Sequence, residues 1–147
     1  MKLSAWSAWL LTACLLVFSA SVNCTSFDLR GASFKSGHPM KGESIETSVQ
    51  DKADIAALEE SIESLKRFPQ IQFEIIGHTD HYECEWNMCS DLALRRARLV
   101  YKMVLDSGID PWRIIALKEY SFNRPIASGH EDYRKNQRVE LNLVEAP

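Results

Sequence analysis

The chain has 147 residues, a length that favours one domain. Its hydrophobic fraction of 46% and charged fraction of 25% are ordinary for a globular protein and exclude an intrinsically disordered chain. The formal net charge of −3, together with the lack of a basic patch interleaved with aromatic residues, argues against nucleic acid as a partner.

The N-terminus predicts export. Lys2 precedes an apolar run, and small residues follow that run at positions 19–21. This pattern is typical of a secretory signal peptide, so residues 1–21 are expected to be removed. A retained membrane helix needs about 20 apolar residues, and this run is shorter. The alternative is a lipid anchor, because residues 11–14 match the pattern that ends in a lipidated bacterial cysteine.

Residues 22–46 are rich in Ser, Gly, Lys and Thr. This composition predicts a linker that leads into an edge strand near residues 32–35. Thr47 or Ser48 is expected to cap the helix that follows. That helix is predicted over residues 51–67, where apolar residues recur at steps of three and four: Ile55, Leu58, Ile62 and Leu65.

The next stretch combines a strand, a polar loop and a helix. Residues 71–76 alternate between apolar and polar, which predicts a half-buried strand that ends at Gly77. Asp80 follows the strand end, and a second helix is expected to begin near Ser90. Polar groups between a strand end and a helix start often bind a ligand.

The second helix is expected to end before Gly108, a residue type that favours helix ends. At the helical period, Arg96 lies in the middle of the apolar arc, whereas the other charged residues lie on the opposite side. A buried, unpaired guanidinium costs several kcal/mol, so Arg96 needs acceptors. Asp80 is the expected counterpart. The alternatives are a purely structural pair and a side chain that extends along the helix to water.

The loop between this strand and this helix contains Cys84 and Cys89. In an exported protein these cysteines are expected to form a disulfide, and its small ring shapes the loop more than it stabilises the fold. The residue types in this loop also suit two other uses, a metal site and a catalytic site. His78, Asp80, His81 and the cysteines have the atom types of a metal site, but their spacing matches no common zinc pattern. His78 and Asp80 also suit a catalytic base and its orienting group, but no nucleophile has a recognisable context.

A third use is recognition of a zwitterion. Asp80 offers acceptors for an ammonium group, and Arg96 offers a fork of donors for a carboxylate. Each contact would be a charge-assisted hydrogen bond. No cofactor and no resident metal is expected at this loop.

The C-terminal part predicts two more strands. Residues 113–117 suit a short strand, residues 118–134 a long irregular segment, and the final strand begins at Asn136. Strand parity places Gln137 on the side that faces the helices and Arg138 on the other side. The order of elements predicts an α+β two-layer sandwich, β-α-β-α-β-β, with two helices on one face of a mixed four-stranded sheet.

Five motifs occur in a fixed order along the chain: Ile-Gly-His-Thr-Asp at 76–80, Asn87, Leu92-x-x-x-Arg96-Ala97-x-x-Val100, Pro125-Ile126 and Asn136-Gln137-Arg138-Val139-Glu140. Together they resemble the OmpA-like C-terminal domain, the peptidoglycan-binding module of bacterial envelope proteins. The resemblance covers roughly residues 30–145, so the domain is expected over residues 30–147.

The resemblance implies a non-enzymatic domain with the same β-α-β-α-β-β fold. Its implied ligand is the diaminopimelate of the peptide stem, with the amine on Asp80 and the carboxylate on Arg96. Thr79 and Asn87 are implied as loop contacts. Gln137 and Arg138 complete the implied ligand-binding set, although the family usually has arginine at the position of Gln137. The interval from Asp80 to Arg96 is also about one residue longer than usual.

These implications describe an exported protein of the periplasm or outer membrane, anchored to the cell wall through peptidoglycan. Other envelope proteins, including outer-membrane proteins, are further expected partners. The alternative is the same fold used as a structural or protein-interaction module without peptidoglycan binding.

Overall fold

A computed structural model describes residues 27–84, 89–129 and 132–144. The predicted signal peptide, the lipid-anchor motif and Asn87 lie outside these residues. Within the described ranges, no helix combines the length and apolar character needed to cross a membrane. The elements in chain order are β1 (Ala32–Ser33), α1 (Ile45–Ser48), α2 (Lys52–Arg67), β2 (Gln72–His78), η1 (Tyr82–Cys84), α3 (Cys89–Asp106), η2 (Pro111–Arg113), β3 (Ile114–Ser121), η3 (Tyr133–Asn136) and β4 (Arg138–Val144), where η marks a short 3-10 helix.

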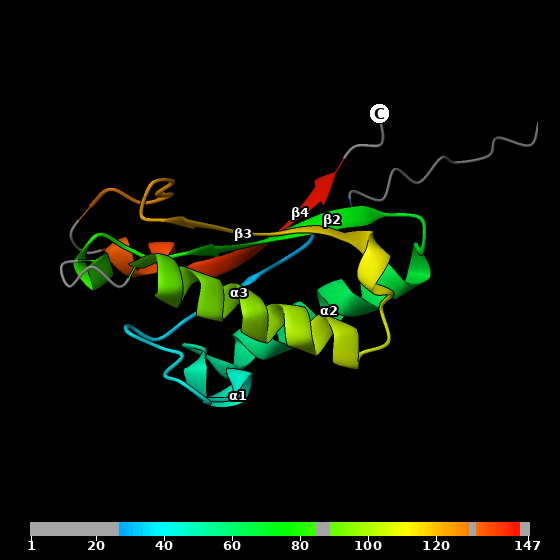
Figure 1. Cartoon of the computed structure of the whole chain (residues 1–147), viewed down its shortest axis with the longest axis horizontal. Helices are drawn as coiled ribbons and strands as arrows, with labels where there is room; N and C mark the ends of the chain where they lie inside the picture. The colour runs from blue at the N-terminus through cyan, green and yellow to red at the C-terminus, as the bar shows by residue number, and fades with distance from the viewer. Residues whose placement is uncertain (1–26, 85–88, 130–131, 145–147) are drawn as a thin grey trace, which may run out of the picture.

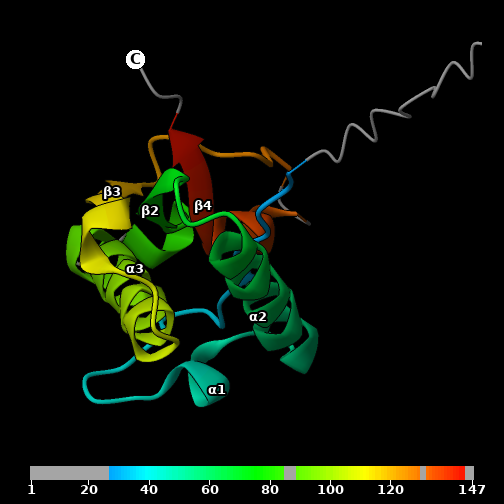
Figure 2. The same cartoon turned by 90° about the vertical axis from the view of Figure 1, so that its right-hand side faces the viewer.

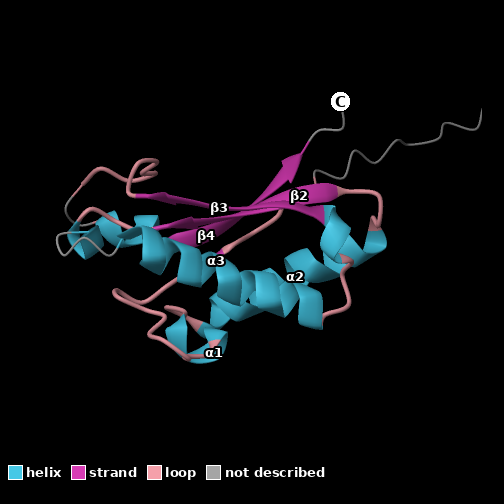
Figure 3. Cartoon of the chain, in the orientation of Figure 1, coloured by secondary structure: helices cyan, strands magenta, loops and turns pink. Residues whose placement is uncertain are grey.

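The strands form one mixed sheet in the order β1-β4-β2-β3. The pair β2–β3 is parallel, whereas β4 runs antiparallel to both β1 and β2. Figures 1 and 3 show α2 and α3 together on one face of this sheet, and Figure 2 shows the two layers from the side. The predicted α+β two-layer sandwich is therefore confirmed, with the short helix α1 as an addition.

The core fills the space between the sheet and the two long helices. Of the four apolar residues predicted on the inner side of α2, Leu58, Ile62 and Leu65 are buried, and Ile55 is partly buried against the core. On α3 the buried apolar residues Ala93, Ala97, Val100 and Val104 face the sheet. Arg96 is buried among them, which confirms its predicted place on the core side of the helix.

The start of α2 differs from the prediction. Thr47 and Ser48 lie in α1, and Asp51 caps α2 instead. The Asp51 carboxylate accepts from Ala53 N at 3.0 Å, and Asp54 accepts from Asp51 N at 3.1 Å, which makes a reciprocal capping box. The chain between the two helices is extended because it bonds to the edge of the sheet, so no helix can continue from Thr47.

Strand β2 is longer than predicted, because it continues through Gly77 to His78. Gly77 pairs with Val139 of β4 on one side and with Glu119 of β3 on the other. A Cβ atom at Gly77 would lie 1.9 Å from the carbonyl oxygen of Ala93. The glycine is therefore required by close contact between β2 and α3 rather than by a turn.

Strand β3 is also longer than predicted, because residues 118–121 belong to it rather than to an irregular segment. Among the residues that the structure describes, no helix covers the outer face of the sheet, so polar side chains on that face are compatible with a strand. Lys118, for example, forms an ion pair with Glu74 of the neighbouring strand β2. The polar composition of residues 118–121 is the reason that an irregular segment was predicted there.

Candidate ligand site at the end of strand β2

Predicted site residues from three separate parts of the chain lie close together at the end of β2. Thr79 and Asp80 follow the strand, Arg96 comes from α3, and Gln137 directly precedes β4. All four are buried, with Arg96 at 0% and the other three at 1% exposure. We call Asp80, Glu83, Arg96 and Gln137 the buried polar cluster, because hydrogen bonds connect them.

Arg96 is fully hydrogen-bonded. Its Nε donates to the His38 carbonyl oxygen at 2.8 Å, and its terminal nitrogens donate to the carbonyl oxygens of His78 at 2.9 Å and Lys35 at 3.1 Å. The two terminal nitrogens also hold the Glu83 carboxylate as a fork, at 2.8 and 2.5 Å. A guanidinium has five N–H donors, so each one has an acceptor here.

Asp80 contacts Glu83 and Gln137 rather than Arg96. One Asp80 carboxylate oxygen accepts from Glu83 N at 2.8 Å, and the other accepts from the Gln137 side-chain amide. The backbone N–H of Asp80 in turn donates to the Glu83 carboxylate at 3.2 Å. Glu83 thus bridges the two residues that were expected to face each other. Glu83 was not predicted as part of the site, although an acid three residues after Asp80, in a turn, is a signal that the sequence contains.

The predicted disulfide between Cys84 and Cys89 is present. It joins the last residue of η1 to the first residue of α3, and therefore ties the turn that carries Glu83 to the helix that carries Arg96. With both sulfurs in this bond, the metal alternative loses its thiolate ligands. Among the described residues, no three His, Cys, Asp or Glu side chains are grouped to hold a metal ion.

A pocket of about 300 Å³ opens over Thr79 and Asp80. Its aromatic walls are made by His81, Tyr82, Phe122 and Tyr133. Asn136 shapes the far side, because its amide group bonds to both N–H and C=O of Ala127. Neither Arg96 nor Glu83 lines this pocket. A ligand in the pocket therefore contacts Asp80 directly but is separated from Arg96.

Arg138 and His78 lie on the outer face of the sheet. Arg138 pairs with Glu140 and also donates to the Arg124 carbonyl oxygen at 3.2 Å. His78 is 1% exposed, and its Nε2 lies 3.5 Å from the Glu140 carboxylate. Parity had placed Arg138 on this side, away from the buried polar cluster. The ring of His78 likewise lies beside Glu140, not Asp80, which removes the geometric basis for a catalytic pair.

The position of His78 predicts a pH effect on stability. Burial, helped by the nearby positive charge of Arg138, lowers the pKa of His78 below its ordinary value of 6.5 and outweighs the opposing effect of Glu140. The unfolded chain therefore takes up a proton that the folded ring resists, and stability falls as the pH drops below about 6.5. Urea unfolding at pH 7.5 and 5.5 should show a smaller pH difference for His78→Gln than for wild type. An equal difference would contradict this assignment.

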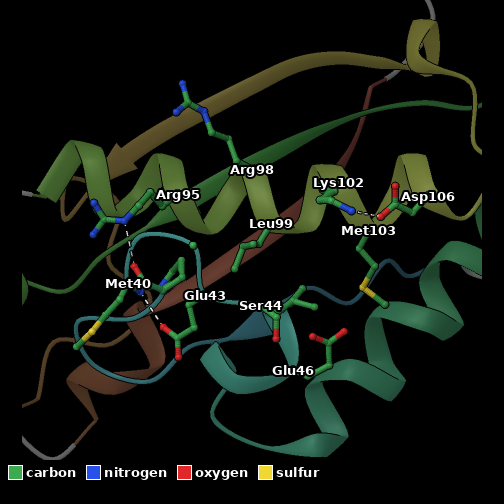
Figure 4. A pocket seen from close by; sticks show the side chains of 13 residues that line it. Met40, Glu43, Ser44, Glu46, Arg95, Arg98, Leu99, Lys102, Met103 and Asp106 are labelled. Atoms are coloured by element: carbon green, nitrogen blue, oxygen red, sulfur yellow. Dashed lines mark hydrogen bonds and ion pairs between the residues drawn. The ribbon is translucent and has the colours of Figure 1, made fainter.

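A larger pocket, of about 660 Å³, lies between the loop before α1 and the outer side of α3. Figure 4 shows Leu99 and Met103 facing into it, with charged side chains around its rim. Arg95 donates to the Pro39 carbonyl oxygen at 3.0 Å, and Lys102 pairs with Asp106. The rim carries both signs of charge, and it does not include the buried polar cluster.

The fold and the cluster at the end of β2 define this chain as an α+β two-layer domain with a buried polar site at one end of its sheet. The sequence model of the OmpA family matches residues 45–138, more than half of the chain, and the chain belongs to that family. A comparison with curated proteins found no match.

Solved structures with the same fold come from several bacteria. The peptidoglycan-associated lipoprotein from Burkholderia pseudomallei is 25% identical, with a TM-score of 0.61 over 78% of this chain and 90% of that one. The C-terminal domain of Helicobacter pylori MotB is 20% identical, with a TM-score of 0.62 over 81% and 87%. The OmpA-like domain of FopA1 from Francisella tularensis is 21% identical, with a TM-score of 0.54 over 66% and 67%.

Proposed function

We propose that this domain binds peptidoglycan non-covalently, through the diaminopimelate of the peptide stem, and so tethers an exported envelope protein to the cell wall. The observation that carries the proposal is Asp80, a carboxylate that lines the pocket at the end of β2 in an OmpA family fold. The similarity to a peptidoglycan-associated lipoprotein supports the same ligand.

Asp80 is suited to an ammonium group. A carboxylate has about four lone-pair sites, and Asp80 uses two of them for Glu83 N and Gln137. The remaining sites can accept charge-assisted bonds from a ligand amine in the pocket. Thr79 adds a polar group to the same wall, and the aromatic walls suit the methylene chain of diaminopimelate. Arg96 is the proposed partner of the ligand carboxylate.

Replacement of Asp80 tests this proposal. Asp80→Asn removes the negative charge with little change in shape, so binding to purified peptidoglycan should weaken by roughly tenfold or more, the cost of a charged hydrogen bond. A sedimentation assay with peptidoglycan measures the change, and melting curves show whether the fold is intact. Asp132→Asn is the matched control, because Asp132 is exposed and pairs only with Lys135 among the described contacts. Wild-type binding by a folded Asp80→Asn variant would refute the assignment.

The proposal includes export. Residues 1–21 are proposed as a signal peptide, with the periplasm or the outer membrane as destination and lipidation at Cys14 as the variant form. The periplasmic domain of Helicobacter pylori MotB and the peptidoglycan-associated lipoprotein from Burkholderia pseudomallei have the same fold, which supports this destination. The mass of the N-terminal peptide of the protein recovered from the bacterial envelope distinguishes the cleaved form from the lipidated form.

One observation favours a second candidate, a structural or protein-interaction module without this ligand. Arg96 is already saturated by acceptors of its own chain. A ligand that binds the folded state raises the melting temperature, and the rise grows with the logarithm of the ligand concentration once that concentration exceeds Kd. An unchanged melting temperature at millimolar diaminopimelate peptide, with an intact fold, would favour this second candidate.

A further inference from the structure

The free domain holds its own carboxylate in the place that the proposed function assigns to the ligand. We infer that Glu83 is an internal competitor for Arg96, so that peptidoglycan binds by exchange of one carboxylate for another and Glu83 limits the affinity. This inference rests on the proposed function and names the residue of this chain that controls it.

The contacts of Glu83 define a complete carboxylate site. One oxygen accepts from Arg96 Nη2 at 2.5 Å and from Gly37 N at 2.8 Å. The other accepts from Arg96 Nη1 at 2.8 Å and from Asp80 N at 3.2 Å. Four donors thus converge on this one group, whose side chain is 2% exposed. A ligand carboxylate would need these same donors, and Arg96 has no further N–H to offer.

The pocket supports the same conclusion independently. It is lined by Asp80 but not by Arg96 or Glu83. A zwitterion in this pocket can place its ammonium on Asp80, but its carboxylate contacts the guanidinium only after the Glu83 side chain leaves. The free domain is therefore organised for an amine, and Glu83 blocks the carboxylate half of the site.

Exchange leaves the guanidinium in position. The carbonyl oxygens of Lys35, His38 and His78 hold Arg96 without any help from Glu83. Glu83 itself lies in the short 3-10 turn η1, next to the exposed residues His81 and Tyr82. Rotation of its side chain brings its carboxylate to water, where the charge is hydrated. The competing group is always nearby, so the apparent affinity equals the intrinsic affinity multiplied by the fraction of molecules in which Arg96 is free.

Substitution of Glu83 tests the inference. Glu83→Gln removes the charge but keeps the shape and one acceptor oxygen, so a diaminopimelate peptide should bind about tenfold tighter or more. Glu83→Asp keeps the charge on a side chain one methylene shorter, and should give an intermediate gain. Glu74→Gln is the matched control, because it removes one acid from the outer face of the sheet, where Glu74 pairs with Lys118. Its affinity should equal that of wild type.

The ligand provides a second comparison. A peptide whose diaminopimelate carboxylate is amidated cannot replace Glu83 on Arg96 as a charged fork, so Glu83→Gln should leave its affinity unchanged. Isothermal titration with both peptides gives the affinities, and melting curves fix a temperature at which every variant is folded.

The outcomes separate the two proposals. Asp80-dependent binding by wild type, with a gain in Glu83→Gln only for the carboxylate peptide, supports exchange. Asp80-dependent binding with no gain, or with a loss, in both Glu83 variants overturns the exchange inference and leaves the proposed function standing. Failure of wild type and of both Glu83 variants to bind overturns the proposed function, and the inference with it.

Discussion

Replacing Arg96 by methionine is expected to lower the free energy of unfolding by about 3–5 kcal/mol, the usual cost of removing one partner from a buried ion pair. Methionine approximates the length of the arginine stem and suits the apolar surroundings. However, the variant leaves the Glu83 carboxylate buried without its guanidinium and removes the donor for three backbone carbonyl groups. Urea unfolding monitored by circular dichroism measures the loss.

Two comparisons assign the cause of this loss. Arg95→Met changes the neighbouring residue of α3. It removes a partly exposed ion pair with Asp91 and one hydrogen bond to the Pro39 carbonyl oxygen, and should cost only about 1 kcal/mol. Adding Glu83→Gln to Arg96→Met should restore part of the stability, because the unpaired carboxylate is then gone. An Arg96→Met variant no less stable than Arg95→Met would contradict a buried ion pair at this site.

The expected contribution of Arg96 to stability affects how its proposed binding role is measured. If an Arg96 variant lost peptidoglycan binding, a single binding assay would not separate a missing ligand contact from a disturbed fold. Asp80→Asn and Glu83→Gln are more informative, because each keeps the volume of the original side chain and the three backbone bonds of Arg96. The expected changes in affinity also have opposite signs, since binding should be weaker for Asp80→Asn and tighter for Glu83→Gln.

Sequence periodicity was sufficient to place two of the four residues of the buried polar cluster. The helical arc of α3 put Arg96 on the core side, and strand parity put Gln137 inside and Arg138 outside. These predictions succeed because regular elements fix the direction of each side chain by position alone. The motif resemblance grouped Arg138 with the ligand-binding residues, whereas parity alone separated it from them.

The partner of Arg96 could not be predicted in the same way. Glu83 lies in a three-residue 3-10 turn, which has no periodicity to indicate where a side chain points. Asp80 is the acid that follows the strand end directly, and this position favours it as the predicted partner of Arg96. The predicted length of β3 was wrong for a related reason. The outer face of a two-layer fold tolerates polar residues, which in a sequence otherwise indicate a loop.

A methyl group at Gly77 is expected to lower the free energy of unfolding about as much as the loss of Arg96, although Gly77 has no side chain that could contact a ligand. In Gly77→Ala the new Cβ would lie 1.9 Å from the carbonyl oxygen of Ala93 and 2.7 Å from its carbonyl carbon. These are backbone atoms inside α3, so no side-chain rotation relieves the clash, and the helix must move away from β2. We expect a loss of about 3 kcal/mol or more in the free energy of unfolding, at the upper end of overpacking effects.

The same displacement should weaken ligand binding. Ala93 lies one turn before Ala97, and Arg96, between them, donates to the carbonyl oxygen of His78, the residue after Gly77. A helix that moves away from β2 therefore stretches this bond and disturbs the fork on Glu83. Gly129→Ala is the matched control for stability, because a Cβ there meets nothing within 4 Å. A Gly77→Ala variant as stable as Gly129→Ala would show that α3 does not need backbone contact with β2, and the fixed position of Arg96 would then require another explanation.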